Sequence, residues 1–155
     1  MKLKELLELW LERYIKNTIK IRTYNRYKSI CELHLIKDLG NHELEELKPI
    51  ILQDFLLKMI DDNYSTNTIK GIVSVLKQAL RLAITLELID KEYCSNLKLP
   101  SSEEKEIAVF IKKEQQIIES FCLNHKRKNY IGIVICLYTG IRLGELLALT
   151  WNDID

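Results

Sequence analysis

Residues 65–88 carry the pattern that most restricts how this chain can fold. Their apolar side chains recur every three or four residues, at Ile69, Ile72, Val73, Leu76, Ala79, Leu80 and Ala83. This spacing matches the turn of an α-helix, so the segment predicts a long helix with one apolar face that other elements must cover. Either Ser65 or Thr66 can cap its start. With 5 Gly and 2 Pro in 155 residues, the chain favours a few long helices over many short strands.

The same spacing predicts further helices before this one. A first helix is expected over residues 2–17 and a second over residues 23–36, with Thr23 as a candidate N-cap. Pro49 suits the first turn of a third helix that reaches about Ile60. A short turn is expected at residues 90–94. Because helices with apolar stripes can close on each other, we expect a mainly α domain of four to five helices at the N-terminal end.

Residues 97–105 lose the helical period and gain polar residues, which is typical of a linker between domains. Beyond it, residues 107–111 predict a short strand, and helices are expected at about residues 112–123, 127–138 and 142–149. Residues 151–155 are expected to lead into another strand. About 50 residues are few for an independent domain, so we expect this second unit to be incomplete.

Composition excludes several classes of site and surface. The 23 basic and 22 acidic residues give a net charge of +1, so a nucleic-acid surface must come from the placement of charge. The four cysteines, at positions 31, 94, 122 and 136, form no close pair, which predicts reduced, mostly buried thiols and no metal site. No apolar run is long enough to span a bilayer. We therefore expect a cytoplasmic protein with no membrane partner and no cofactor.

Basic residues are placed unevenly along the chain. Six lie between residues 13 and 31 without an acid: Arg13, Lys16, Lys20, Arg22, Arg26 and Lys28. Another acid-free stretch, residues 63–86, carries three more. On the long predicted helix, Lys77 and Arg81 follow Lys70 by seven and eleven residues, which places all three within about 20° of one face. With a nearby serine they form what we call the basic ridge, which consists of Lys70, Ser74, Lys77 and Arg81.

The basic ridge has two interpretations on charge alone. It can be a solvated helix face, as charged faces usually are, or a surface that follows DNA phosphates. The start of the same helix, Ser65, Thr66, Asn67 and Thr68, adds hydroxyls, an amide and free N–H groups, which suit a phosphate oxygen. Capping accounts for one of these four residues.

Residues 139–155 read TGIRLGELLALTWNDID. This segment resembles the first catalytic box of the tyrosine recombinases, the phage integrase family, which reads roughly T-G-x-R-x-x-E-x-x-x-L-x-W-x-D-I-D. An ordered string of matches is far more specific than a lone G-x-R. Upstream, residues 23–27, Leu39-Gly40 and residues 64–70 resemble the family's core-binding domain. Two connectors depart from the family pattern, at Lys37 and at Glu92-Tyr93, which affects only the expected turn geometry.

The resemblance implies a SAM-like helical core-binding domain over residues 1–98, a linker over residues 99–105, and the incomplete, mostly helical start of an α+β catalytic domain over residues 106–155. The implied partners are a double-stranded DNA recombination site and other recombinase protomers, and the protein would associate with the nucleoid when DNA-bound. The implied DNA contacts are Thr23, Arg26, the four residues at positions 65–68 and the basic ridge.

In the family's reaction a tyrosine attacks a DNA phosphodiester and forms a 3′-phosphotyrosyl intermediate, with no metal or cofactor. Arg142 matches the first arginine that neutralises the transition state, and Glu145, three residues on, could hold its guanidinium in place. A surface ion pair is the alternative interpretation of this pair.

All seven tyrosines precede Arg142, so none matches the nucleophile, and Tyr24, Tyr27 and Tyr138 are interpreted as core residues. We therefore expect this chain alone not to cleave DNA. Three functions remain open: the DNA-binding portion of a tyrosine recombinase acting in DNA integration and recombination, a standalone helical DNA-binding or regulatory protein, and a helical protein-interaction module. Salt-dependent duplex binding would separate the first two from the third.

Overall fold

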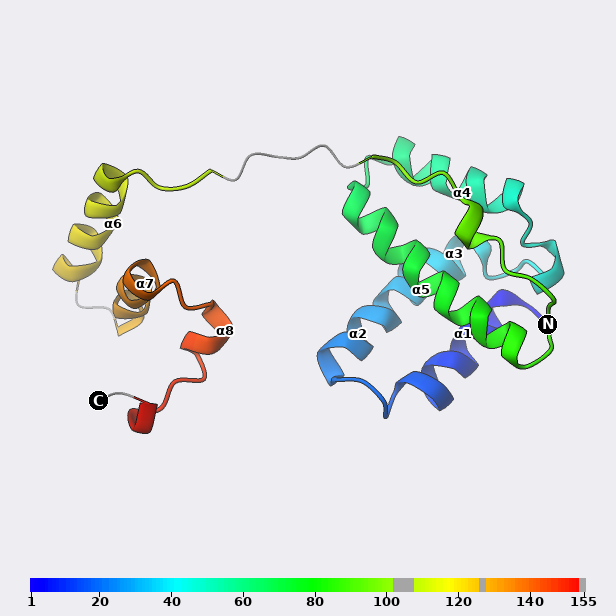
Figure 1. The fold of residues 1–155 in the computed structure, drawn as a ribbon, viewed down its shortest axis with the longest axis horizontal. Helices are drawn as coiled ribbons and strands as arrows, with labels where there is room; N and C mark the ends of the chain where they lie inside the picture. The colour runs from blue at the N-terminus through cyan, green and yellow to red at the C-terminus, as the bar shows by residue number, and fades with distance from the viewer. Residues whose placement is uncertain (102–107, 126–127, 154–155) are drawn as a thin grey trace. The chain divides into compact units, whose positions relative to one another are not determined.

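The structure, a computed structural model, describes residues 1–101, 108–125 and 128–153, and every regular element in these ranges is helical. The mainly α fold expected from the sequence is therefore confirmed for this part of the chain (Figure 1). The chain divides into two compact units, Met1–Glu103 and Glu104–Asp155. Most of the linker expected at residues 99–105 lies outside the described residues. None of the described helices is both long and apolar enough to cross a membrane.

The first unit begins with two helical runs that each contain a wider π-helical segment. Helix α1 (Leu3–Leu9) continues into π-helix Trp10–Ile15. Helix α2 (Ile21–Ile30) continues through a π-helix, Cys31–Leu35, into α3 (Ile36–Leu39). These two runs correspond to the two helices expected over residues 2–17 and 23–36.

The expected N-cap of the second run was wrong. Thr23 lies inside the first turn of α2, where its backbone N–H donates to the carbonyl of Lys20 at 2.9 Å. Lys20 is the N-cap, because the helix begins at Ile21, two residues earlier than the sequence suggested.

The next two helices begin where the sequence predicts. Pro49 opens α4 (Pro49–Asp61), and Ser65 caps α5 (Thr66–Thr85) by accepting the backbone N–H of Thr68 at 3.2 Å. Between them, Asn63 has φ of 61°, a left-handed conformation that asparagine tolerates better than most residues. A short 3₁₀ turn, Cys94–Asn96, completes the unit.

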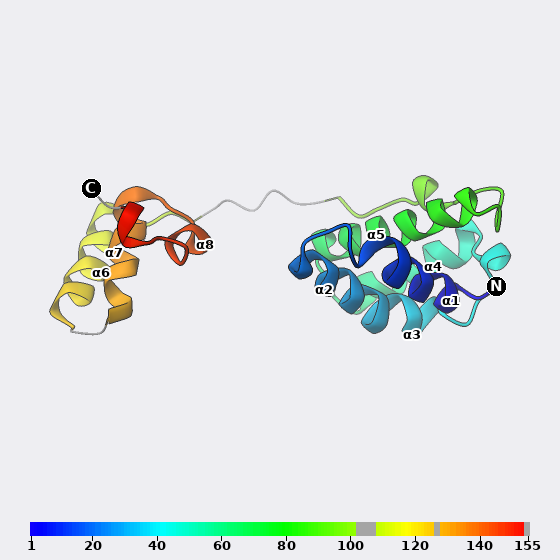
Figure 2. The ribbon, with the colours of Figure 1, turned by 90° about the horizontal axis from the view of Figure 1, so that it is seen from below.

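Helix α5 is the centre of the hydrophobic core. The whole stripe expected from the sequence is buried, each side chain being at most 4% exposed. Figures 1 and 2 show α5 crossing over α1 and α2, and it contacts both. On the same core Trp10 stacks on Tyr27, with ring centroids 5.7 Å apart. Burial of one face of α5 therefore fixes α2 beside it and leaves the opposite face to solvent.

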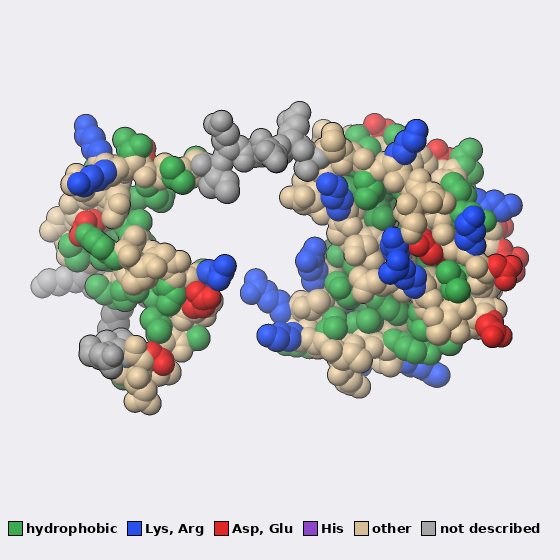
Figure 3. Space-filling view, viewed as in Figure 1, with side chains coloured by type: hydrophobic (Ala, Val, Ile, Leu, Met, Phe, Trp, Pro, Cys, Tyr) green, Lys and Arg blue, Asp and Glu red, His purple; other side chains and the backbone are tan. Residues whose placement is uncertain are grey.

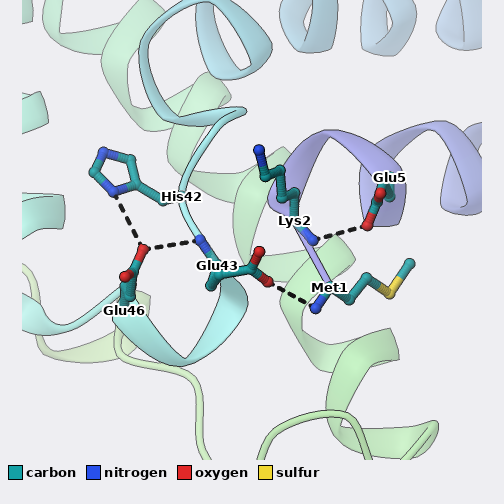
Figure 4. Close-up of polar contacts among 6 residues, drawn as sticks. All are labelled: Met1, Lys2, Glu5, His42, Glu43 and Glu46. Atoms are coloured by element: carbon teal, nitrogen blue, oxygen red, sulfur yellow. Dashed lines mark hydrogen bonds and ion pairs between the residues drawn. The ribbon is translucent and has the colours of Figure 1, made fainter.

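The start of α1 is tied to the connector that follows α3 (Figure 4). The backbone N–H groups of Leu3 and Lys4 donate to the carbonyls of His42 and Gly40. The α-amino group of Met1 donates to Glu43 at 2.7 Å, and this hydrogen bond raises the pKa of the amine. These contacts hold the two ends of the α1–α3 region together.

Cysteine burial agrees with the sequence-based expectation. Cys31, Cys94 and Cys122 are buried, Cys136 is half-buried, and all four are free thiols. Desolvation by burial raises the pKa of Cys31 and of Cys94 to about 12. Both thiols therefore stay protonated at neutral pH and act as small apolar core residues.

Helix α5 ends with an unusual residue. Glu87 has φ of 57° and follows the C-cap, and the backbone N–H groups of Glu87 and Leu88 donate to the carbonyls of Ile84 and Ala83. This is a Schellman motif, in which the left-handed position is usually glycine. A glutamate there also places negative charge at the negative end of the helix dipole.

Replacing Glu87 with Gly should therefore stabilise the first unit by about 1 kcal/mol, because it removes both the left-handed strain and the charge. The midpoint of urea unfolding measures this gain. Glu87→Gln is the matched control: it removes only the charge and should recover a minor part of the gain. Equal gains in stability for both variants would contradict the view that the gain comes from relief of the left-handed backbone conformation.

The second unit contains α6 (Lys112–Asn124), α7 (Lys128–Thr139) and a single-turn helix, α8 (Leu143–Leu146). One expectation was wrong: residues 108–111 are not a strand, since no described segment pairs with them, and residue 107 lies outside the described ranges. Residues 151–153, expected to lead into another strand, form a 3₁₀ turn, and residues 154–155 are not among those described.

Large apolar side chains of the second unit are mostly exposed. Tyr138, expected in the core, is 65% exposed, and its hydroxyl instead donates to Glu119 at 2.7 Å. Cys122 is the one fully buried residue among those described in this unit. The exposed apolar side chains include Val109, Phe110, Ile117, Phe121, Ile131, Leu143, Leu147 and Trp151. The second unit therefore packs α6 on α7 without enclosing a core.

Candidate nucleic-acid interface

The basic ridge lies on the face of α5 opposite the buried stripe. Lys70, Ser74 and Arg81 are exposed, and Lys77 is half-buried. Within the described residues none of its three cations takes part in an ion pair. The ridge therefore keeps its full positive charge, as a surface that binds phosphates requires.

The basic residues of the first helical runs divide into neutralised and free cations. Lys16 pairs with Glu12 at 2.6 Å, and Lys28 pairs with Glu32 at 3.8 Å. Hydrogen bonds from Lys16 and Tyr24 lower the pKa of Glu12, which keeps this carboxylate charged. Glu12 and Glu32, which lie just outside the acid-free stretch, thus neutralise two of the cations within it. Among the six basic residues between positions 13 and 31, four form no ion pair with the described residues: Arg13, Lys20, Arg22 and Arg26.

Acidic side chains are placed unevenly on the first unit. On the face shown in Figure 3, Asp and Glu side chains gather toward the end with the N-terminus, whereas Lys and Arg side chains lie both there and on the part of the surface away from that end. At the acidic end Glu45, Glu87 and Asp90 line one groove together with Lys91. The part of this face away from the acidic end therefore carries basic side chains without acids beside them.

Beside the basic ridge, a hollow of about 350 Å³ lies between α2, its π-helical extension and the first turns of α5. We call it the α2–α5 hollow. Its polar lining comprises Arg26, Ser29, His34, Asn67 and Thr68, and its apolar lining comprises Ile30, Leu33 and Ile72. The structure thus brings Arg26 together with two residues from the start of α5, which the sequence had placed on a DNA surface separately.

The sequence-based reasoning missed Ser29 and His34. Both follow Arg26 along one helical run, at offsets of three and eight residues, so they share its side of the helix. His34 also packs edge-on against Tyr64, with ring centroids 5.3 Å apart. Helical offsets from Arg26 would have identified both residues. That they line a hollow follows only from the packing of α5 against α2 and its π-helical extension.

Arg26 reaches across to α5. A Cβ atom built on Gly71 would lie 3.1 Å from Nη2 of Arg26, so the guanidinium rests against the backbone of α5 at this glycine. Arg26 itself is exposed. Its planar head therefore lies at the border between the two helices, within the α2–α5 hollow.

The remaining predicted DNA contacts are used differently. Ser65 Oγ lies 2.8 Å from Thr68 Oγ1 and accepts the capping N–H, so this hydroxyl serves the helix end. Thr66 Oγ1 donates to the carbonyl of Ser101 at 3.4 Å. Thr23 is half-buried in α2 and does not line the hollow. Asn67 and Thr68 are the residues of the helix start that face the hollow.

In the second unit, Arg142 and Glu145 form the contact expected from the sequence. The backbone N–H of Arg142 donates to Glu145 Oε2 at 3.0 Å, and its Nη1 donates to Oε1 at 3.3 Å. The Arg142 side chain remains 86% exposed. This is also the geometry of a surface ion pair, the alternative interpretation, and most of the five N–H donors of the guanidinium stay available to a ligand.

Two comparisons decide the family. A model described as "Phage integrase, N-terminal SAM-like domain" matches residues 2–60. The solved integrase-like domain from Bacillus cereus is 30% identical, aligns with 68% of this chain and 88% of its own length, and superimposes with a TM-score of 0.62. This chain belongs to the phage integrase family of tyrosine recombinases. The family and the SAM-like fold expected from the sequence are therefore confirmed.

Longer members of the family match nearly the whole chain. The integrase of Saccharopolyspora erythraea is 28% identical over 155 residues, which are 96% of this chain but 35% of that protein. Lambda integrase, solved as a dimer bound to a COC′ core site, is 21% identical and has a TM-score of 0.86 over all of this chain and 43% of its own. The chain thus spans about a third of the length of that curated integrase.

Proposed function

We propose that this chain is the DNA-binding portion of a site-specific recombinase that acts in DNA integration and recombination. The single observation that carries the proposal is the basic ridge, which runs along α5 beside the α2–α5 hollow and whose cations form no ion pair with the described residues. Lambda integrase is bound to DNA and to a second copy in its solved structure. By this likeness the partners are double-stranded DNA and other protomers of the recombinase.

In this proposal the two units have different tasks. Residues 1–98 bind the duplex, residues 99–105 link the units, and residues 106–155 begin the catalytic domain. Lys70, Lys77 and Arg81 follow the phosphates of one strand, because lysine and arginine release condensed counterions when they approach the DNA backbone. These contacts position the protein without reading sequence.

Arg142 supplies a catalytic group in the whole recombinase. A tyrosine hydroxyl attacks the phosphorus of a phosphodiester, a 3′-phosphotyrosyl bond forms, and the 5′-oxygen leaves as a hydroxyl. The guanidinium of Arg142 donates hydrogen bonds to the phosphate oxygens, whose charge grows in the transition state. Glu145 acts through Arg142, by holding its side chain in place. The seven tyrosines of this chain all precede Arg142, so we expect no covalent DNA adduct from it alone.

The dependence of duplex affinity on salt tests the proposal. Changing both Lys77 and Arg81 to Ala should weaken binding to every duplex sequence and reduce the slope of log K against log salt by about one to two units. Fluorescence anisotropy with a labelled duplex measures both quantities. The physical reason is that each lost phosphate contact releases about one counterion fewer.

Lys91→Ala is the matched control, because Lys91 lies at the acidic end of the first unit, beside Glu87 and Asp90. Its slope should equal that of the parent chain. An unchanged slope in the Lys77 and Arg81 variant would remove the basic ridge from the DNA surface. Absence of any duplex binding would instead favour a protein-interaction module.

A further inference from the structure

Gly71 is an unexpected residue in the middle of α5. Glycine is among the least favourable residues inside a helix, and α5 is the longest helix that the structure describes. Gly71 does not have a positive φ, so its backbone conformation is one that alanine also adopts. The reason for glycine must therefore be space rather than backbone freedom.

The space beside Gly71 is occupied by Arg26. Among the described residues, and apart from the backbone of α5 itself, the guanidinium Nη2 is the one atom within 4 Å of a Cβ built there, at 3.1 Å. A methyl group at this position would push the flexible end of Arg26 away from α5. Arg26 forms no ion pair with the described residues, so its donors are free for a ligand.

We propose that the α2–α5 hollow reads the edge of a DNA base through Arg26, and that Gly71 is a positioning residue which leaves room for the Arg26 guanidinium beside α5. This inference rests on the proposed DNA-binding function and deepens it. It divides the surface in two: the basic ridge binds phosphates, and the hollow selects sequence.

The lining of the hollow favours a base over a phosphate. A phosphate offers only acceptors, to which the hydroxyls of Ser29 and Thr68 and the amide of Asn67 can donate. The same three groups can also accept hydrogen bonds, and beside them lie the apolar side chains Ile30, Leu33 and Ile72, which have nothing to offer a phosphate. Base edges present donors, acceptors and the methyl group of thymine, and arginine is the commonest partner of guanine.

Selection from a random duplex pool tests the role of Arg26. The probe is a set of duplexes with a randomised centre of about 20 base pairs, two helical turns, bound by the 155-residue chain. The parent chain should enrich one motif. Arg26→Ala should lose the preference at one or two adjacent positions and bind that motif about 5- to 150-fold more weakly. Lys77→Ala should keep the motif and lower affinity for all sequences alike.

A double-mutant cycle tests Gly71. Gly71→Ala should raise the thermal midpoint by about 4 °C through better helix propensity, and weaken binding to the enriched motif at least fivefold. In the Arg26→Ala background, Gly71→Ala should leave DNA affinity unchanged, because the group that it displaces is gone. Thr85→Ala is the matched control: it also improves helix propensity in α5 but lies away from the hollow.

The outcomes separate this inference from the proposed function. If Arg26→Ala keeps the motif and lowers the salt slope by about one, Arg26 binds a phosphate and the inference is overturned while DNA binding stands. An equal loss from Gly71→Ala with and without Arg26 would overturn the positioning role. A parent chain that binds duplex but enriches no motif overturns base reading, and one that binds no duplex overturns the proposed function itself.

Discussion

Amide hydrogens in the middle of α5 should exchange at least about 10⁴-fold more slowly than those in α7, when the chain is studied as a monomer at neutral pH. Amides in a closed core exchange only when the whole unit unfolds, which costs about 5–15 kcal/mol. Amides in a poorly covered helix exchange by local opening at a small fraction of that cost. Hydrogen–deuterium exchange read by NMR or mass spectrometry measures the ratio.

Burial accounts for this difference between the units. In α5, Ile72, Leu76 and Leu80 are each at most 1% exposed, whereas in α7 Ile131 is 57% and Ile133 43% exposed. An uncovered apolar surface of this kind drives self-association or partial unfolding. Measurements at several protein concentrations therefore control for oligomers, which would protect α7 from outside.

Limited proteolysis should give the same result. We expect cleavage within or after residues 99–104 and a resistant fragment of about 100 residues, because poorly packed segments are cut first. Equal protection of both units in a monomer would contradict this expectation. It would mean that the second unit is complete as it stands, and that its interpretation as the start of a catalytic domain is wrong.

Leu76→Ala should destabilise the first unit by about 2–5 kcal/mol, a large part of the stability of a domain of this size. Leu76 is 1% exposed and lies at the centre of the buried stripe of α5. Its loss removes apolar contacts and leaves a cavity that the helices around it cannot fill without moving. Urea unfolding followed by circular dichroism measures the change.

Leu57→Ala provides the control, because Leu57 in α4 is 50% exposed and should cost less than about 1 kcal/mol. Similar costs for the two variants would contradict the central place of α5 in the core. The basic ridge lies on the other face of α5, so folded Leu76→Ala protein should keep the salt slope of the parent chain.

The sequence predicted those parts of the fold that depend on local chemistry. The α5 stripe, the Ser65 cap and Pro49 at the start of α4 each follow from interactions within one or two turns, and the structure agrees with all three. The start of α2 was misplaced because Thr23 is a good capping residue in a place where the helix already continues. Local preference for a cap does not decide a helix start on its own.

Features that depend on contacts between distant segments of the chain were harder to predict. The strand expected at residues 107–111 fits its apolar composition, but a strand needs a neighbour to pair with, and no described segment supplies one. Tyr138 shares a helix with apolar residues, yet it is exposed because the unit does not enclose a core.

The candidate site shows the same division. The basic ridge could be predicted because helical geometry fixes the spacing of Lys70, Lys77 and Arg81 along one helix. The α2–α5 hollow could not be predicted, since it depends on how two helices pack against each other. The contact between Arg26 and Gly71 joins residues 45 positions apart, and nothing in either local sequence indicates it.

Mapping of backbone amide shifts during titration with a duplex tests most directly whether α2 and α5 form the DNA surface. With the whole chain and a duplex of about 30 base pairs, the largest shift changes should fall on residues 22–34 and 65–81 and fade as salt is raised. The acidic end, residues 43–46 and 87–90, should stay unchanged. Changes centred on the acidic end, or none on α2 and α5 under conditions where the duplex binds, would contradict the proposed interface.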